Sequence, residues 1–281
     1  MSIKTELFMC CHKQYELLPP LWKPILCGAA LNAPVEGAVR DDGGDNLSAL
    51  NRQYCELTAH YYAWKNIEAD YYGFCHYRRF FGTQGCTKRP YLALGQPNEA
   101  QRTRLLGDEE YWRSLISAHD IILPRSEDMG LSAREHYITS IYHYEDDLRL
   151  FTEILAQHAP QLAKTAEEYL AQRRQHFCNM FIMSRGYFHE YCSILFPVLA
   201  EFDRRKTLHG DFQSDRTDGY LGELFTGIFA SYCRSNGARV AEVPRLDLQC
   251  SRKKRIGCAL LPPESRRRFI AKRLAKKLRR K

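Results

Sequence analysis

The spacing of apolar residues along the chain alternates between a helical pattern and one typical of buried strands. Between residues 47 and 64, apolar side chains recur every three or four positions, which predicts one helix with a single buried stripe. Asn46 or Ser48 can cap its first turn, because both side chains accept hydrogen bonds from free backbone amides. The same spacing predicts further helices over residues 130–157, 160–174, 186–204 and 217–236.

Short apolar runs separate these helices. The run 71–77 is almost continuously apolar or aromatic, as expected of a strand buried on both faces of a parallel sheet. Other strands are expected over residues 3–11, 119–123, 177–184 and 239–243, with loops at 28–46 and 82–107. Alternating strands and helices predict an α/β sandwich, with a mostly parallel central sheet flanked by helices.

Charge divides the chain into two parts. The net charge is +8, but residues 251–281 hold 14 basic side chains against one acidic side chain. The preceding 250 residues hold 27 basic and 32 acidic side chains. We therefore expect an acidic domain over residues 1–250 and a basic tail over residues 251–281. A domain that binds nucleic acid is disfavoured, since it would spread Lys and Arg over a binding face.

The tail has its own apolar spacing. After Pro262 and Pro263, Ile270, Leu274 and Leu278 recur every four residues among Lys and Arg, which predicts a basic amphipathic helix. Such a helix binds an anionic membrane surface. Two alternatives remain, a solvated tail and a patch for nucleic acid or a partner protein. The residues expected at the membrane are Arg266, Arg267, Phe269, Ile270, Arg273, Leu274, Lys277 and Leu278.

The eleven cysteines form no disulfide framework, because their number is odd, their spacing is irregular and no C-x-x-C pair occurs. The N-terminus has no secretory signal, and no run of about 18 apolar residues could cross a membrane. A reduced, cytoplasmic compartment is expected.

Candidate chemistry follows the predicted strands, because ligands of open α/β sheets bind beyond the carboxyl ends of the strands. This rule selects residues 12–13, 76–79, 125–126 and the stretch around Asn179. His76, Arg78 and Arg79 point to an anionic ligand, since guanidinium groups bind phosphate oxygens bidentately. The alternative is an arginine pair at the rim that binds acids such as Asp70.

A second candidate stretch, residues 216–223, holds two carboxylates where a loop enters a helix. Asp218 or Glu223 could act as a general base, although from the spacing alone helix capping by Asp218 and a solvated Glu223 are the better explanation. No metal site is expected, because the histidines lack ligand spacing and no D-x-D tripeptide ends a strand. The fingerprints of P-loop enzymes, Rossmann dehydrogenases and α/β-hydrolases are also absent.

Several motifs along the chain resemble those of a family of bacterial capsular and lipopolysaccharide biosynthesis proteins, and they occur in the same order. That family was once labelled a domain of unknown function and is now treated as glycosyltransferases. The most distinctive is Gly73-Phe74-Cys75-His76-Tyr77-Arg78-Arg79-Phe80-Phe81. The others are Cys11-His12-Lys13, Asp45-Asn46-Leu47-Ser48, Asn51, residues 53–58, Trp64-Lys65-Asn66, residues 179–183, and Arg216 with Gly219, Tyr220 and Glu223. The resemblance covers roughly residues 5–245.

The resemblance implies a GT-A-like fold and sugar transfer from a nucleotide-diphosphate donor to a lipid-linked surface glycan. UDP-galactofuranose or another UDP-hexose is a candidate donor. Glu223 occupies a family position and is the better candidate for the catalytic base, whereas an acid at Asp218 departs from the pattern. The donor-binding candidates are His12, Lys13, Asn46, Asn51, His76, Arg78, Arg79, Asn179 and Arg216.

The missing D-x-D tripeptide leads to a mechanistic hypothesis. We expect His76, Arg78 and Arg79 to replace the usual Mg²⁺ or Mn²⁺ at the leaving diphosphate, so that the enzyme needs no cofactor and inverts the sugar with one base. A lipid-linked acceptor and a basic tail place the protein peripherally on the inner face of the cytoplasmic membrane. The alternative functions are a non-catalytic glycan or nucleotide-sugar binding protein and a hydrolase of phosphorylated sugars.

Overall fold

The computed structural model describes residues 3–140, 143–209 and 216–260, together with Ser265 and Ile270. In this part of the chain, ten strands form one sheet with the central order β11-β7-β10-β4-β1-β2-β3. All neighbours along this path are parallel except β10, which runs antiparallel to both β4 and β7. These strands are β1 (Thr5–Cys11), β2 (Trp22–Leu26), β3 (Val39–Arg40), β4 (Tyr71–His76), β7 (Ile121–Pro124), β10 (Phe181–Ser184) and β11 (Val240–Val243).

Three short strands extend the sheet beyond β4. β5 (Arg79–Phe81) pairs with β4 and β12 (Arg245–Asp247), and β12 also pairs with β6 (Tyr91–Ala93). A separate two-stranded sheet joins β8 (Glu127–Asp128) to β9 (Arg174–Gln175). The predicted α/β sandwich with a mostly parallel central sheet is therefore confirmed.

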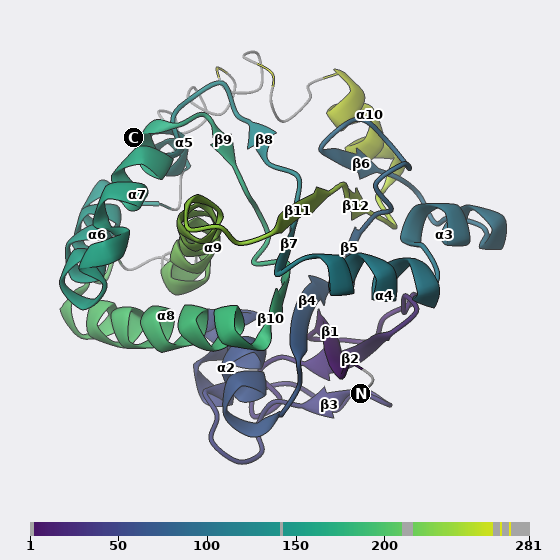
Figure 1. Cartoon of the computed structure of the whole chain (residues 1–281), viewed down its shortest axis with the longest axis horizontal. Helices are drawn as coiled ribbons and strands as arrows, with labels where there is room; N and C mark the ends of the chain where they lie inside the picture. The colour runs from purple at the N-terminus through teal and green to yellow at the C-terminus, as the bar shows by residue number, and fades with distance from the viewer. Residues whose placement is uncertain (1–2, 141–142, 210–215, 261–264, 266–269, 271–281) are drawn as a thin grey trace.

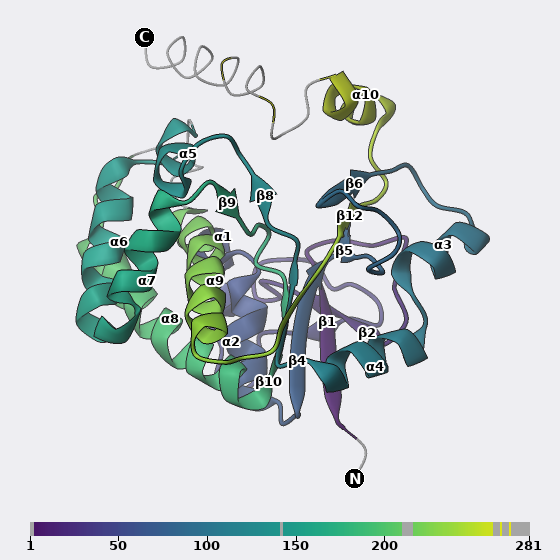
Figure 2. The ribbon, with the colours of Figure 1, turned by 45° about the horizontal axis from the view of Figure 1, so that its top comes forward.

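Helices cover both faces of the sheet (Figures 1 and 2). The helices α6 to α9 lie on one side of the sheet, and α3 and α4 lie on the other. The described helices are η1 (Ser48–Leu50), α1 (Asn51–Tyr54), α2 (Leu57–Asn66), α3 (Glu99–Leu106), α4 (Glu109–Ala118), α5 (Ala133–Thr139), α6 (Glu145–His158), α7 (Pro160–Ala171), α8 (Arg185–Arg205), α9 (Thr217–Ser235) and α10 (Arg252–Leu260).

Alternation along the strands gives each face its own core. Phe8 and Phe74 belong to the core under α2, α8 and α9, and their rings stack with centroids 5.9 Å apart. Leu7 and Cys75, their neighbours in the sequence, belong to the core on the opposite face. Strand β4 is fully buried over its four central residues, as its apolar run predicts.

The predicted helix over residues 47–64 is broken, which corrects the sequence-based expectation. Cys55 separates α1 from α2 with a φ of 52°, a left-handed conformation that interrupts a helix. The Asn51 amide donates to the Cys55 carbonyl at 2.7 Å and stabilises this break. Neither expected cap bonds to the start of α1 or α2; Asn46 instead accepts from the Ser48 amide at 3.1 Å. Apolar spacing reports which face is buried, not whether the helix is continuous.

Other boundaries differ less from the prediction. The helix expected over residues 130–157 is divided into α5 and α6, whereas α7 begins at Pro160 as predicted. Strand β10 begins only at Phe181, because Cys178 and Asn179 have φ values of 81° and 45°. The loop expected over residues 82–107 contains β6 and α3.

All eleven cysteines are free thiols, and most of them are buried. Among the described helices, none combines the length and the apolar character that crossing a membrane requires. Of the predicted membrane-binding tail residues, only Ile270 is described, and its side chain is exposed. Arg266, Arg267, Phe269, Arg273, Leu274, Lys277 and Leu278 lie outside the described residues.

Candidate active site

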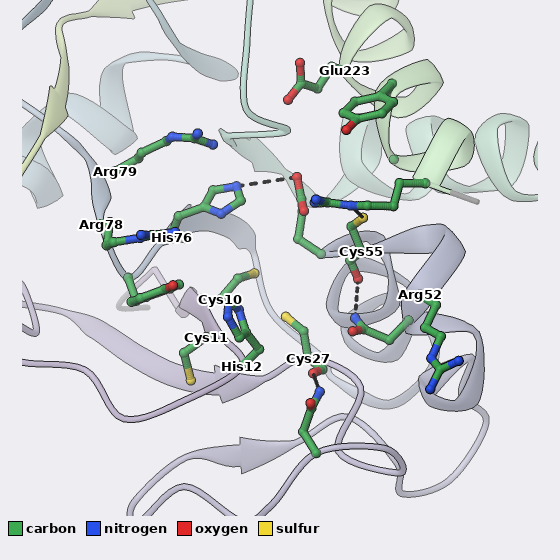
Figure 3. A pocket seen from close by; sticks show the side chains of 17 residues that line it. Cys10, Cys11, His12, Cys27, Arg52, Cys55, His76, Arg78, Arg79 and Glu223 are labelled. Atoms are coloured by element: carbon green, nitrogen blue, oxygen red, sulfur yellow. Dashed lines mark hydrogen bonds and ion pairs between the residues drawn. The ribbon is translucent and has the colours of Figure 1, made fainter. Parts of the chain in front are cut away.

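The carboxyl ends of β1 and β4 lie side by side, because these strands are parallel with Cys10 opposite His76. Strand β10 runs in the opposite direction, so the residues that precede it reach the same edge of the sheet. A cavity of about 570 Å³ opens at this edge (Figure 3). It is lined by Cys10, Cys11, His12, Cys27, Asn32, Asn51, Arg52, Cys55, Glu56, His76, Tyr77, Arg78, Arg79, Arg216, Gly219, Tyr220 and Glu223.

The structure brings most of the candidate residues together. The candidates that line the cavity are His12, Asn51, His76, Arg78, Arg79, Arg216 and Glu223. They come from the ends of β1 and β4, the turn into β5 and its first residue, the start of α1, and the N-terminal end of α9. Arg125, which follows β7, does not line the cavity; its guanidinium donates to the Thr87 carbonyl at 2.6 Å and the Gln84 carbonyl at 3.0 Å.

Three candidate donor-binding residues lie outside the cavity wall. Lys13 places its ammonium 6.0 Å from the centre of the Tyr77 ring. The amide of Asn46 donates to the backbone carbonyls of Asp42 and Gly44, so it braces its own loop. Asn179 is buried behind the wall, where its amide donates to Glu56 and to the Gly219 carbonyl, both at 2.9 Å. Asn46 and Asn179 therefore support the site rather than face its interior.

Asp218, the second catalytic candidate, also lies outside the cavity. Its side chain is fully buried and lies 2.9 Å from the ammonium of Lys206. Burial raises the pKa of Asp218 to about 7, and the nearby Asp203 charge raises it as well. This geometry gives Asp218 a structural ion pair and no access to a bound ligand, which argues against its catalytic assignment.

Positive charge surrounds the cavity. Burial lowers the pKa of His12, and the charges of Lys13, Arg78 and Arg216 lower it further. Within the described chain, neither Arg78 nor Arg79 pairs with Asp70, whose carboxylate accepts from the Lys4 backbone amide at 2.8 Å. The rim-pair alternative is therefore wrong with respect to Asp70. Among the described residues neither guanidinium forms a salt bridge with Asp70, so both can contribute positive charge toward an anionic ligand.

The orientation of His76 is fixed by two acceptors. Its Nε2 lies 2.8 Å from the Cys178 carbonyl oxygen and 3.4 Å from Oε1 of Glu56. A carbonyl oxygen only accepts hydrogen bonds, so Nε2 carries the proton. The left-handed backbone at Cys178 and Asn179 places that carbonyl next to the end of β4.

Glu223 is the titratable group that best fits a base. Burial raises its pKa to about 7, the negative charge of Glu56 raises it too, and Arg79 and His76 act in the opposite direction. Arg79 and Glu223 enter the cavity from opposite sides, with their side chains pointing toward one another (Figure 3). A carboxyl group with a pKa near neutrality can take up and release a proton under working conditions.

Glycine makes this position of Glu223 possible. A Cβ atom on Gly219 would lie 3.1 Å from the Cys55 sulfur, and one on Gly222 would lie 2.8 Å from the Leu57 side chain. The first turns of α9 therefore pack directly against the break between α1 and α2. This close approach brings Glu223 to the cavity.

Sequence reasoning missed Glu56, Arg52 and Tyr220 as cavity residues. Burial opposes ionisation of Glu56, but His76 and the hydrogen bond from Asn179 outweigh it and hold its pKa at about 2. The apolar spacing puts Glu56 and Arg52 within one continuous predicted helix, and the motif at residues 53–58 contains Glu56 without giving it a role. Among the described residues, no group of three or more His, Cys, Asp and Glu side chains is arranged to hold a metal ion.

The fold is that of a glycosyltransferase-like α/β protein. The structure is similar to the apo structure of WbbM, a bifunctional glycosyltransferase, with a TM-score of 0.81 and 26% sequence identity. The similarity covers 88% of this chain and 46% of that chain, so this protein spans about half the length of WbbM.

The chain belongs to the family described as domain of unknown function DUF4422, which it matches over residues 6–235. Both findings confirm the resemblance predicted from the motifs. No curated protein matches the chain.

Proposed function

We propose that this protein is a glycosyltransferase that moves a sugar from a nucleotide-diphosphate donor to a glycan acceptor. The observation that carries the proposal is one cavity lined by Arg78, Arg79 and His76 together with Glu223. Such a cavity provides positive charge for a diphosphate and a carboxylate for the acceptor hydroxyl. The similarity to WbbM supports this assignment.

The leaving group explains the cationic side of the cavity. As the glycosidic bond to the donor breaks, negative charge develops on the diphosphate, and preorganised cations stabilise that charge in the transition state. Arg78 and Arg79 bind the phosphate oxygens, and His76 lies beside them. Arg216 and His12 extend this surface toward the nucleoside, together with Asn51.

The acceptor hydroxyl must lose a proton as it attacks the sugar, and Glu223 takes that proton. One base is sufficient when the acceptor attacks the face opposite the leaving group, so the transfer inverts the anomeric centre. In this mechanism the arginines and His76 do the work of a divalent cation, and no cofactor is required.

The donor and acceptor are proposed at the level of class. A UDP-hexose, UDP-galactofuranose among them, is the proposed donor, and a lipid-linked oligosaccharide of a capsule or O-antigen is the proposed acceptor. The basic tail, residues 251–281, would hold the enzyme on the inner face of the cytoplasmic membrane. Deleting residues 262–281 should abolish pelleting with anionic liposomes, and unchanged pelleting would refute the membrane role.

The decisive experiment combines binding with turnover. Nucleotide sugars are screened by thermal shift, and the stabilising donor is then incubated with and without glycan acceptors while nucleoside diphosphate release is measured. Glu223→Gln should bind the donor like the wild type but lose about 10²–10⁴-fold in rate. A non-catalytic binding protein would bind the donor without releasing nucleoside diphosphate. A hydrolase would release the diphosphate equally well without an acceptor.

A further inference from the structure

Glu56 lies within the motif at residues 53–58, but that motif assigned it no role in the site. It follows Cys55 at the break between α1 and α2, and its side chain is only 13% exposed. Its Oε1 lies 2.9 Å from the Asn179 amide and 3.4 Å from Nε2 of His76. One carboxylate oxygen therefore joins the helix break to the end of β4 and to the segment before β10.

We propose that Glu56 is a positioning residue of the active site, which holds the His76 imidazole at the end of β4 and sets the charge state of Glu223. This inference rests on the proposed function, because it assigns Glu56 a role in the same transfer. Glu56 contacts neither reacting group in this scheme; it acts through its neighbours.

The hydrogen bonds around Glu56 support the first part of the proposal. His76 donates from Nε2 to the Cys178 carbonyl, and the same nitrogen lies 3.4 Å from Glu56, so rotation of the ring would lose both contacts. Asn179 donates to Glu56 and to the Gly219 carbonyl, and this links the same network to the start of α9.

The charges around the two glutamates support the second part of the proposal, that Glu56 sets the charge state of Glu223. Glu56 and Glu223 line one cavity, and two carboxylates that share a site resist simultaneous ionisation. Glu56 is the carboxylate with cationic and amide donors around it, so it keeps its charge and Glu223 is left to bind the proton. The titratable and charged groups that act on Glu223 are Glu56, His76, Arg79, Cys55, Cys178 and Tyr169.

Glu56→Gln removes the negative charge of Glu56 and keeps a hydrogen-bond acceptor, because the glutamine amide oxygen can still accept from both Asn179 and His76. The rate of transfer by the wild type should rise with pH as Glu223 ionises. In Glu56→Gln this rise should move to lower pH, by on the order of one unit. A purely structural role for Glu56 would lower the rate at every pH without moving the rise.

Two further variants serve as controls. Glu56→Asp keeps the charge, and the pH at which the rate rises should stay within a few tenths of a unit of the wild type. Glu242→Gln removes a carboxylate that is also ion-paired, to His176 at 3.2 Å and Arg234 at 2.8 Å, but lies outside the cavity. Its pH profile should match the wild type. Should Glu56→Gln fail to fold, a shifted profile in Glu56→Asp would overturn the proposal.

A measurement without turnover separates this inference from the proposed function. The Glu223 carboxyl carbon is titrated by ¹³C NMR in the wild type and in Glu56→Gln, with Glu223→Gln identifying its resonance. A titration that moves to lower pH in Glu56→Gln supports the role of Glu56, and an unmoved titration overturns it. Wild-type protein that transfers no sugar from any nucleotide donor would refute the proposed function, whatever the titration shows.

Discussion

The ammonium nitrogen of Lys206 lies 2.9 Å from a carboxylate oxygen of Asp218, and the two side chains are only 7% and 0% exposed. Lys206 also lies 2.5 Å from Asp203, which accepts a hydrogen bond from the Tyr54 hydroxyl at 2.9 Å. This buried network connects the end of α8, the start of α9 and α1. The acid at position 218 thus has a structural partner outside the cavity.

Removing the cation from this network should destabilise the fold. In Lys206→Met, the buried carboxylate of Asp218 loses its counter-charge, and breaking a buried pair in this way costs about 3–5 kcal/mol. Urea unfolding of the variant and the wild type measures the loss. A change of less than about 1 kcal/mol would contradict a buried ion pair at this position.

Asp218→Asn provides the matched control for the proposed base. Asp218→Asn and Glu223→Gln each convert a carboxylate of α9 into an amide, but only Glu223 lines the cavity. Folded Asp218→Asn should transfer sugar at the wild-type rate per folded molecule, whereas Glu223→Gln should not. A folded Asp218→Asn protein that loses about 10²-fold or more in rate would restore Asp218 as a catalytic candidate.

The pH dependence of transfer should report Glu223. Its pKa is raised to about 7, first by burial and then by Glu56, and a base acts only when it is deprotonated. The rate should therefore fall about tenfold for each pH unit below this pKa and level off above it. Steady-state rates between pH 5 and pH 9, at saturating donor and acceptor, test this. A rate that is flat across pH 7 would contradict Glu223 as the base.

Chelation should leave the reaction unaffected. If Arg78, Arg79 and His76 stabilise the leaving diphosphate, EDTA will not change the initial rate, and added Mn²⁺ or Mg²⁺ will not increase it. Replacing both arginines by methionine should then lower the rate far more than chelation does. A strict requirement for a divalent cation would refute the metal-independent mechanism.

The buried position of His60 leads us to expect that the free energy of unfolding depends on pH. Its ring is completely buried between Phe74 and Phe181, and neither ring nitrogen has a hydrogen-bond partner among the described residues. Burial lowers the pKa of His60 from 6.5 to about 3. The unfolded chain binds a proton at His60 that the folded chain rejects between these pH values. Stability is therefore lost as the pH falls below 6.5, by up to about 1.4 kcal/mol per pH unit.

His60→Leu removes this penalty. The stability difference between His60→Leu and the wild type should grow in favour of the variant as the pH is lowered from 8 to 5, measured by urea unfolding. Parallel pH dependences of the two proteins would show that His60 does not remain neutral in the fold.

Two glycines of the helical layer should respond oppositely to alanine. A Cβ atom on Gly227 in α9 would overlap the Tyr169 ring, whose hydroxyl accepts from the His176 amide at 2.9 Å. Gly227→Ala should therefore destabilise the fold by about 1–3 kcal/mol. Gly186 in α8 has open space around its Cβ position, so Gly186→Ala should stabilise it by about 0.5–1 kcal/mol. Urea unfolding decides both, and similar effects of the two substitutions would contradict this packing.

The sequence predicts the sheet and the site residues at the ends of β1 and β4 for a clear physical reason. A fully buried strand needs a continuous apolar run, and the polar residues that end the run must emerge at the sheet edge, which located His12 and His76. The direction of β10 was not predictable, because a central strand has the same apolar pattern whether it runs parallel or antiparallel to its neighbours.

The site residues on the helical side, near the α1–α2 break and on α9, depend on backbone geometry that residue patterns do not encode. Cys55 has a left-handed φ although cysteine has no preference for it, and Glu56 reaches His76 only because of that break. Asp218 and Glu223 lie on the same short stretch of α9. Only tertiary packing determines that Asp218 pairs with Lys206 while Glu223 lines the cavity.

The antiparallel course of β10 has a consequence for the order in which the protein is made. The contacts that close the cavity join residues far apart in the sequence, with 102 positions between His76 and Cys178 and 123 between Glu56 and Asn179. A growing chain that ends before β10 carries the arginines but lacks the segment that orients His76, and the base arrives later still, with α9. Because such distant contacts form late, the proposed donor site is complete only when nearly the whole domain has folded.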